Sequence, residues 1–232
     1  PARGAPMEQM KRYAVYYAPR PGEFAARAAG WLGWDAEAGT PLPQPDLPGL
    51  PFPAILTAEA RRYGFHGTLR APFRLAEGLA PETAAETVKV LASRHAPVIC
   101  EGLKLENLHG FLALTPFGCE AALLELGAAV VEGTNALRAP LSQAETARRH
   151  PAQLTPRQRT LLDLWGYPHV MEEFRFHLTL SDRLPDPEPA TTVLLDYLAP
   201  VLPRAFVIED LCLFGEDDLG RFHLLHRYAL TG

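Results

Sequence analysis

The hydrophobic and polar positions in the first quarter of the chain predict a strand, a helix and a long loop. Residues 11–18 are rich in aromatic and β-branched side chains and end before Pro19, a pattern typical of a strand. Residues 23–34 carry Ala, Leu and Trp at helical spacing, which predicts a helix. Six prolines between positions 35 and 53 disfavour regular structure, so we expect an extended surface loop there, with a lid as one possible role.

The remainder of the chain shows the same order of elements twice. The first copy consists of a strand, a helix and two strands, at residues 63–73, 81–94, 97–107 and 110–115. The second copy has the same order, at residues 173–184, 188–198, 206–214 and 221–230. Each copy is therefore predicted to be a β-α-β-β unit.

A constant numerical offset supports an internal duplication. Shifting the chain by 111 positions superposes Phe65-His66-x-Thr68-Leu69 on Phe176-His177-x-Thr179-Leu180, Phe111 on Phe222 and Leu114 on Leu225. The separation from the motif histidine to the downstream phenylalanine is 45 in both copies (111 minus 66, and 222 minus 177). A matched motif with a matched downstream element at equal spacing indicates duplication.

Two helices are expected between the copies. Residues 120–137 form an apolar helical run, and Thr155-Pro156-Arg157-Gln158 has the capping-box pattern before an apolar run ending at Trp165. We therefore expect one α+β domain over residues 10–232 with two lobes. If the antiparallel sheets of the lobes face each other about a pseudo-twofold axis, a central cleft lies between them. Lobe one spans about 10–118, connecting helices 119–172 and lobe two 173–232, while residues 1–9 are expected to be a tag or disordered.

Composition excludes several classes of protein. A net charge of -5 argues against a protein that binds a nucleic-acid backbone, which usually carries a basic surplus. No run approaches eighteen apolar residues and the N-terminus lacks a secretory pattern, so we expect a soluble, cytoplasmic protein without membrane contact. The three cysteines, Cys100, Cys119 and Cys212, form no CxxC pair, and we expect reduced, buried thiols.

The two His-x-Thr motifs carry the candidate chemistry. Because side chains alternate along a strand, His66 and Thr68 share one face, as do His177 and Thr179. Two imidazoles and two hydroxyls would then surround one phosphoryl group. Histidine, with an ordinary pKa near 6.5, can act as general acid or base, and threonine hydroxyls can hold phosphate oxygens. We therefore expect catalysis without a metal or cofactor and a bell-shaped pH profile around neutrality.

These motifs, FHGTL and FHLTL on duplicated α+β units, resemble those of the two-histidine (2H) phosphoesterase superfamily. The segments RYAVYYAP, WLGWDAE, YGFHGTLRAPFRL and FRFHLTLSDRL are similar to an uncharacterised branch encoded in phosphonate-utilisation operons. The resemblance implies a bilobal fold in which His66 and His177 are acid and base and Thr68 and Thr179 bind phosphate. For this branch it implies a cyclic phosphate substrate such as 5-phosphoribosyl 1,2-cyclic phosphate.

Further substrate-binding candidates follow from position. A second phosphate needs extra cations, and even-numbered offsets from the histidines place Arg70 and Arg175 on the cleft face. Weaker candidates are Arg148 and Arg149 between the copies and Tyr13 or Tyr17 on the first strand. The six other histidines show no ligand spacing, so no metal site is expected.

Two other functions remain open at this point. One is RNA end processing at 2′,3′-cyclic or 2′,5′ termini, which the net acidity disfavours. The other is a non-catalytic module that binds phosphate or nucleotide. We expect a small-molecule partner and a monomer, and the pseudo-symmetric motifs do not distinguish the acid from the base.

Overall fold

The strands of this α+β protein form one central antiparallel sheet. The computed structural model describes residues 7–50 and 52–232. The sheet has seven strands in the order β11-β10-β1-β4-β8-β7-β6, and every neighbouring pair is antiparallel. Their bounds in chain order are β1 (Arg12–Tyr17), β4 (Gly67–Phe73), β6 (Gly102–Leu108), β7 (Phe111–Phe117), β8 (Leu178–Thr179), β10 (Asp210–Glu216) and β11 (Phe222–Ala229).

Two short pairs of strands and a set of helices complete the fold. The pairs are β2 (Trp34–Asp35) with β3 (Thr40–Pro41), and β5 (Val98–Cys100) with β9 (Phe206–Ile208). The α-helices are α1 (Glu23–Leu32), α2 (Pro53–Leu56), α3 (Pro81–Ala92), α4 (Glu120–Thr134), α5 (Gln143–Ala147), α6 (Pro156–Trp165) and α7 (Glu188–Leu198). The 3-10 turns are η1 (Met7–Gln9), η2 (Ala60–Tyr63), η3 (Asn135–Leu137), η4 (Pro151–Gln153), η5 (Met171–Glu173) and η6 (Ala199–Val201).

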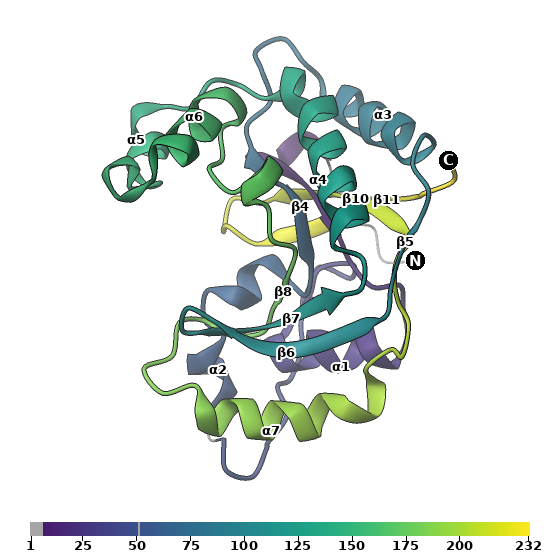
Figure 1. The fold of residues 1–232 in the computed structure, drawn as a ribbon, viewed down its shortest axis with the longest axis vertical. Helices are drawn as coiled ribbons and strands as arrows, with labels where there is room; N and C mark the ends of the chain where they lie inside the picture. Colours follow the sequence, from purple (N-terminus) through teal and green to yellow (C-terminus); the bar gives the residue numbers. More distant parts are fainter. Residues whose placement is uncertain (1–6, 51) are drawn as a thin grey trace.

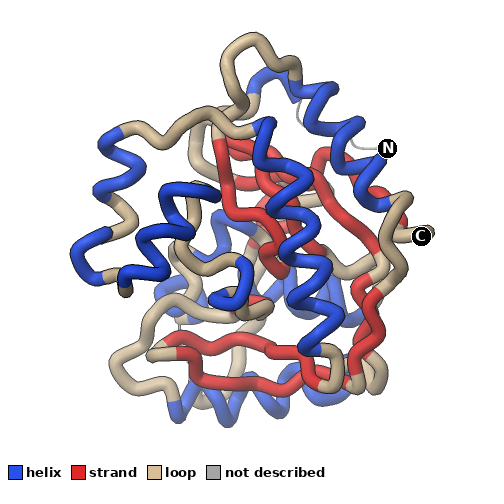
Figure 2. The backbone as a smooth tube through the Cα atoms, turned by 45° about the horizontal axis from the view of Figure 1, so that its top comes forward, coloured by secondary structure: helices blue, strands red, loops and turns tan. Residues whose placement is uncertain are grey.

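Helices lie around the strands (Figure 2). Helix α4 packs on β4, α3 packs on β10 and β11, and α7 packs on β6. In Figure 1, α3 and α4 lie in the upper part of the molecule, and α7 runs below β6 and β7. No helix in the described part of the chain is both long and apolar enough to cross a membrane.

The two β-α-β-β units predicted from the sequence are present, and they exchange hairpins. The hairpin β6–β7 of the first unit pairs through β7 with β8, the motif strand of the second. The hairpin β10–β11 of the second unit pairs through β10 with β1, which is the neighbour of the first motif strand, β4. The repeated copies therefore lie within the ranges 10–118 and 173–232, and their strands share a single sheet (Figure 1).

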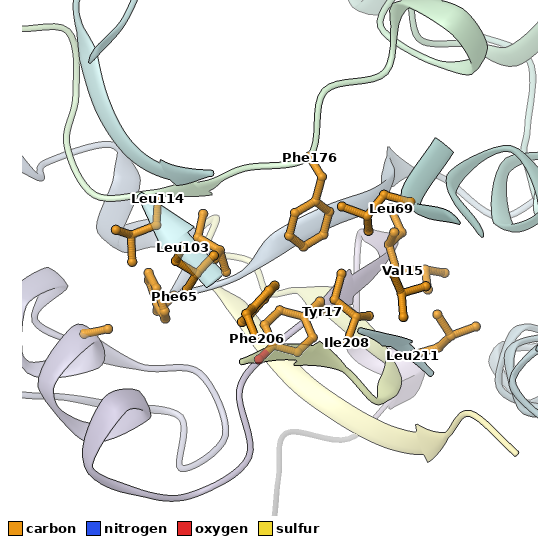
Figure 3. Packing of buried hydrophobic residues seen from close by; sticks show 14 of the residues in the cluster. Val15, Tyr17, Phe65, Leu69, Leu103, Leu114, Phe176, Phe206, Ile208 and Leu211 are labelled. Atoms are coloured by element: carbon orange, nitrogen blue, oxygen red, sulfur yellow. The ribbon is translucent and has the colours of Figure 1, made fainter. Parts of the chain in front are cut away.

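One face of the sheet carries the main hydrophobic core. Phe65, Leu69, Phe176, Leu178 and Leu180 are all buried in it, as the alternation of both motifs predicts. Figure 3 shows the ring of Phe176 pointing into this cluster, near Tyr17 and Phe206. The ring centroid of Tyr17 lies 6.2 Å from that of Phe176 and 5.2 Å from that of Phe206. Burial of these apolar groups on one face leaves the opposite face for the polar members of the motifs.

Most predicted helices agree with the structure to within a few residues. Helix α7 has the predicted bounds, and α6 begins at the predicted capping box, in which Thr155 and Gln158 each satisfy a backbone N–H of the other. The predicted strand 173–184 is wrong, because only Leu178 and Thr179 form a ladder there. The prediction for residues 35–53 missed the β2–β3 ladder and the start of α2; residue 51 lies outside the described residues.

Two further expectations are corrected. Cys100 and Cys119 form a disulfide, because the β6–β7 hairpin returns the chain to the end of β5; only Cys212 is a free, buried thiol. Residues 7–9 are not disordered: they form η1, the Tyr13 hydroxyl donates to the carbonyl of Met7, and Met7 packs against the core. Residues 1–6 lie outside the described residues.

Candidate active site

The two His-Thr pairs lie at the starts of two adjacent strands at the centre of the sheet, each histidine directly before the first residue of its strand. Gly67 on β4 is paired with Leu178 on β8, and these two positions differ by the 111 residues of the internal repeat. Equivalent residues that face each other across antiparallel strands place a pseudo-twofold axis between them. Extending the register by one residue sets His66 opposite Thr179 and Thr68 opposite His177, all on the face away from the core.

A glycine in the first motif allows the two strands to approach. A Cβ at Gly67 would lie 2.2 Å from the ring carbon Cζ of Phe176. The phenylalanine of the second motif therefore packs where a side chain of the first would be. This explains why the motifs read HGT and HLT. Leu178 has a side chain in the core, whereas at the equivalent position, Gly67, the ring of Phe176 fills that space.

Both imidazoles are held in the same way by the chain that precedes them. His66 Nδ1 lies 3.0 Å from the carbonyl oxygen of Gly64, and His177 Nδ1 lies 2.8 Å from that of Arg175. A carbonyl can only accept, so each Nδ1 carries the proton and each Nε2 is the free nitrogen. Nε2 of His66 lies 3.3 Å from the Thr68 hydroxyl, on the polar side of the sheet.

The surroundings of the histidines favour neutral rings. Burial lowers the pKa of His66 to about 4, and the hydrogen bond to Gly64 and the charge of His177 act as smaller influences in opposite directions. Burial also lowers the pKa of His177, against the hydrogen bond to Arg175. The Tyr16 ring stacks on His66 with centroids 4.0 Å apart, whereas the nearest aromatic ring to His177, Phe111, is 5.5 Å away.

A cavity of about 360 Å³ opens over this face of the sheet. His66, Thr68 and Thr179 line it; His177 is not among the lining residues, although its neighbour Phe111 is. The other walls come from β1, the 59–63 turn, β4, the segment between the repeats and the chain after β8. Their residues are Tyr16, Glu59, Ala60, Tyr63, Ala71, Pro72, Arg149, Tyr167, Ser181, Asp182 and Arg183. A cavity of this size fits one small ligand.

Among the tyrosines of the first strand, the structure places Tyr16 at the site. Tyr13 and Tyr17 belong to the main core, and the Tyr13 hydroxyl donates to a backbone carbonyl 2.6 Å away. Tyr16 points the other way and is paired in register with Thr68. The candidates Tyr13 and Tyr17 were wrong. Alternation along the strand predicts that these two tyrosines share a face, but only the pairing of β1 with β4 decides that this face is the core.

Arg70 and Arg175 do not line the cavity. The register between β1 and β4 shifts on both sides of Arg70, so alternation from His66 breaks and Ala71 and Pro72 face the cavity instead. Arg175 precedes the two-residue strand β8, and its guanidinium donates to the carbonyls of Glu172 and Phe174 at the surface. The prediction that both arginines face the cleft was wrong. It rested on their even spacing from the histidines, and that spacing fixes the face only along an unbroken strand.

The segment between the repeats supplies one predicted cation. Arg149 lines the cavity, with its guanidinium 4.8 Å from the ring centroid of Tyr167, while Arg148 is exposed outside it. Sequence reasoning missed Ser181 and Arg183. Ser181 shares the parity of His177 and Thr179, which was an available signal, but its hydroxyl is engaged with the backbone of Leu112 and Asp182.

Acid–base groups and hydrogen-bond donors surround the cavity. Within the described residues, no three His, Cys, Asp or Glu side chains are grouped so as to hold a metal ion. The carboxylate of Asp182 accepts from the backbone N–H groups of Glu59 and Ala60, which fixes the turn that forms one wall. Arg149 and Arg183 supply positive charge to the lining of the cavity, and Glu59 is the second carboxylate there beside Asp182.

Two longer proteins are similar in sequence to this chain. The chain is 39% identical over 180 residues to a Janthinobacterium sp. (strain Marseille) protein named ribose 1,5-bisphosphate phosphokinase PhnN, covering 76% of this chain and 40% of that protein. It is 39% identical over 176 residues to the protein of the same name from Laribacter hongkongensis (strain HLHK9), covering 75% and 40%. The chain therefore spans about two fifths of the length of these relatives.

Solved structures show weaker similarity. E. coli LigT complexed with ATP is 13% identical, with a TM-score of 0.46, covering 96% of this chain and 99% of that chain. The protein TT0787 of Thermus thermophilus is 17% identical, with a TM-score of 0.45 and coverage of 95% and 98%. A protein described as a phosphoesterase is 15% identical, with a TM-score of 0.42 and coverage of 96% and 99%.

A family model matches residues 68–223, a span that begins at Thr68 and includes both His177 and Thr179. It covers more than half of the chain. The protein therefore belongs to the DUF1045 family, whose description is "protein of unknown function".

Proposed function

We propose that this protein is a metal-independent phosphoesterase that opens a small cyclic phosphodiester by two-histidine acid–base catalysis. The observation that carries the proposal is the central pair Gly67–Leu178, which sets two His-Thr pairs opposite each other on one polar face. Each imidazole has its Nδ1 fixed by a backbone carbonyl, so its Nε2 is free to exchange a proton. The charges of Arg149 and Arg183 support binding of an anion in the same cavity.

The reaction needs one base and one acid. In the proposed mechanism the neutral His66 Nε2 takes a proton from water, and the water oxygen forms a new bond to phosphorus. The ring P–O bond breaks, and protonated His177 delivers its proton from Nε2 to the leaving sugar oxygen. The product is a phosphate monoester and a free hydroxyl. Thr68 and Thr179 donate to the non-bridging oxygens, where charge develops in the transition state.

The different burial of the two histidines supports one assignment of their roles, with His66 as the base and His177 as the acid. His66 lies under the ring of Tyr16, and its pKa of about 4 keeps it neutral, as a base must be. His177 is in looser contact with Phe111 and accepts a proton more readily, which suits the acid. Bound phosphate adds negative charge and raises the pKa of both rings, so the acid becomes protonated when substrate is present.

The favoured substrate is 5-phosphoribosyl 1,2-cyclic phosphate. Water addition that breaks the bond between phosphorus and the 2-oxygen leaves ribose 1,5-bisphosphate. The curated relatives are named for a phosphokinase that acts on this compound. In this proposal the part of those proteins that resembles this chain produces the compound used by the remainder, which places both in phosphonate breakdown.

A 2′,3′-cyclic nucleotide is the second candidate substrate, as expected of RNA end processing. Its support is the aromatic lining of the cavity by Tyr16, Tyr63, Tyr167 and Phe111, because nucleobases stack on such rings. The cavity of about 360 Å³ has room for one nucleotide at most, which favours a mononucleotide over an RNA strand.

Phosphorus NMR in the presence of EDTA tests the proposal. The protein is mixed separately with 5-phosphoribosyl 1,2-cyclic phosphate and with 2′,3′-cyclic nucleotides, and the same mixtures are repeated with His177→Ala and with the control Arg148→Met. We expect ring opening of the ribosyl compound by the wild type and by the control, and none by His177→Ala. Opening of nucleotides alone would support RNA processing. Tight binding without turnover of either would support a non-catalytic binding module.

A further inference from the structure

Arg70 is a buried cation whose hydrogen bonds are mostly unmade. Its side chain is 1% exposed, in the middle of β4. Nη2 donates to the side-chain oxygen of Asn135 at 3.3 Å, while Nε and Nη1 have no partner among the described residues. The guanidinium also lies 5.6 Å from the ring centroid of Phe73. Neither neighbour carries a negative charge.

A second arginine approaches the same place. Arg138, directly after η3, donates from Nε to the same oxygen of Asn135 at 3.4 Å. Its other donors reach only backbone carbonyls, those of Ala139 at 3.2 Å and Leu164 at 3.4 Å. Within the described chain, neither Arg70 nor Arg138 forms an ion pair. Two guanidinium groups therefore share one neutral acceptor.

The nearby acid does not neutralise this pair. Glu145 is held by Arg74 through two bonds, of 3.1 and 2.9 Å, so its charge is already matched. Burial and the charge of Arg138 lower the pKa of Arg70 to about 10, and burial lowers the pKa of Arg138 against the smaller, opposite influence of Glu145. Both groups remain positive at neutral pH, which leaves an excess of buried positive charge.

The two arginines line a small pocket beside the active-site cavity, together with the ion-paired Arg74 and Glu145. The pocket has a volume of about 10 Å³, and it shares Ala71, Pro72 and Tyr167 with that cavity. The Arg138 side chain packs against Gly166, where a Cβ would lie 2.9 Å from Arg138 Nε. In this form the pocket admits about one oxygen-sized atom. Arg138 is half-buried and held by long bonds, so its side chain can move to admit a larger group.

A buried charge without a counter-charge is costly, so buried charges are usually paired, and a buried cation without a partner in the chain is suited to an anion from outside it. We propose that Arg70 and Arg138 form a second oxyanion subsite, which takes a phosphate or carboxylate of the same molecule whose phosphodiester lies at the histidines. The part of this inference that concerns the substrate rests on the proposed function. The binding of an oxyanion by the two arginines does not.

The first test is thermal unfolding of the full chain with and without inorganic phosphate, in a His66→Ala background that weakens binding at the catalytic centre. Without phosphate, Arg70→Met is expected to raise the melting temperature, because it removes an unpaired buried charge. With phosphate, the stabilisation seen in the parent is expected to be lost in Arg70→Met and in Arg138→Met. The exposed Arg175→Met is the control and should behave as the parent.

The outcomes of this test are distinct. A structural role for Arg70 predicts a lower melting temperature in Arg70→Met and an unchanged response of Arg138→Met to phosphate, and that result would overturn the subsite. Arg138→Met serves alone if Arg70→Met does not fold, because Arg138 is half-buried and its loss leaves β4 intact. Phosphate stabilisation that persists in both variants also rejects the proposal.

The second test uses a matched pair of substrates, 5-phosphoribosyl 1,2-cyclic phosphate and ribosyl 1,2-cyclic phosphate. Arg138→Met is expected to raise KM about 10- to 100-fold for the substrate with the 5-phosphate and to leave KM for ribosyl 1,2-cyclic phosphate unchanged. The reason is that only the 5-phosphate can accept a charge-assisted hydrogen bond from Arg138. Equal effects on both substrates would overturn the second-group assignment. Absence of turnover with either substrate contradicts the proposed function, while the phosphate result still decides the oxyanion subsite.

Discussion

The two histidine motifs share a sequence pattern but differ in their surroundings. Each holds its Nδ1 proton on the carbonyl two residues earlier, at 3.0 Å for His66 and 2.8 Å for His177. His66, however, continues into a strand of seven residues, β4, and lies against Tyr16 in a second hydrophobic cluster. His177 continues into a strand of two residues, β8, beside Phe111.

This difference shows how a duplicated motif acquires two roles. The pseudo-twofold axis at Gly67 and Leu178 keeps the two nitrogens and two hydroxyls in equivalent positions, as binding of a phosphoryl group requires. The side chains that pack against the two imidazole rings can differ, because they are not part of the pair of strands that the pseudo-twofold axis relates. The environment therefore sets the proton affinity of each ring, while the symmetric backbone sets its direction.

The largest expected effect is the loss of activity when either histidine is replaced, and the pH dependence of kcat/KM distinguishes their roles. His66→Gln and His177→Gln should each lower kcat about 10²- to 10⁴-fold. In the wild type, kcat/KM should fall below about pH 4, where His66 becomes protonated, and should also fall above the pKa of His177, on the acid side of 6.5. This places the profile at lower pH than the neutral optimum expected from the sequence.

The residual activity then identifies the roles. The pH profile of kcat/KM for His66→Gln should lose its acidic limb, and the profile for His177→Gln should lose its alkaline limb. Both are measured between about pH 3.5 and 9, a range that includes the two pKa values. Circular dichroism of both variants controls for folding. Exchange of the two limbs between the variants would reverse the assignment of acid and base.

Stability at low pH offers the next test, independent of substrate. The pKa of His66 is about 4 in the folded protein and near 6.5 when unfolded. Between these values the unfolded chain binds a proton that the folded chain does not, so the free energy of unfolding falls as the pH drops from 6.5 to 4. The full shift corresponds to at most about 3 kcal/mol, reduced by water in the cavity at the ring edge.

Chemical unfolding at pH 7.5 and pH 4.5 measures this loss. His66→Gln should lose less stability on acidification than the wild type, and His177→Gln should show a smaller difference in the same direction. The exposed His226→Gln is the control and should retain the wild-type slope. An identical slope in His66→Gln and the wild type would show that the ring is not desolvated.

The sequence was sufficient for the local parts of the fold and the motif. Apolar alternation placed Phe65 and Phe176 in the core and the histidines opposite them, and helix α7 and the capping box at Thr155 were found directly. These features depend on neighbours within a few residues, where propensity and spacing act.

Features that depend on pairing between distant segments were not predictable. The exchange of hairpins between the repeats, the disulfide between Cys100 and Cys119 and the choice of Tyr16 all follow from strand register. The irregular register around Arg70 was not predicted, although Pro72 in the same strand is a residue that sheets tolerate mainly at edges and bulges, and it moved this arginine from the cavity to the adjacent pocket. Arg149 was named as a candidate from the sequence, but its separation from Arg148, which lies outside the cavity, depends on how the segment between the repeats packs.

The smallest expected effect tests the cause of the asymmetry. Tyr16→Leu removes the ring stacked 4.0 Å from His66, so water should reach the imidazole and its pKa should rise by roughly one unit toward 6.5. Phe111→Leu, the matched change beside His177, should move the pKa of His177 less, since that ring lies 5.5 Å away. NMR titration of the imidazole resonances measures both, and the melting temperature controls for the roughly 1–3 kcal/mol lost with a buried ring. If the pKa of His66 stays near 4 in Tyr16→Leu, the desolvation comes from the other walls, and the two halves differ by the depth of the cavity rather than by one tyrosine.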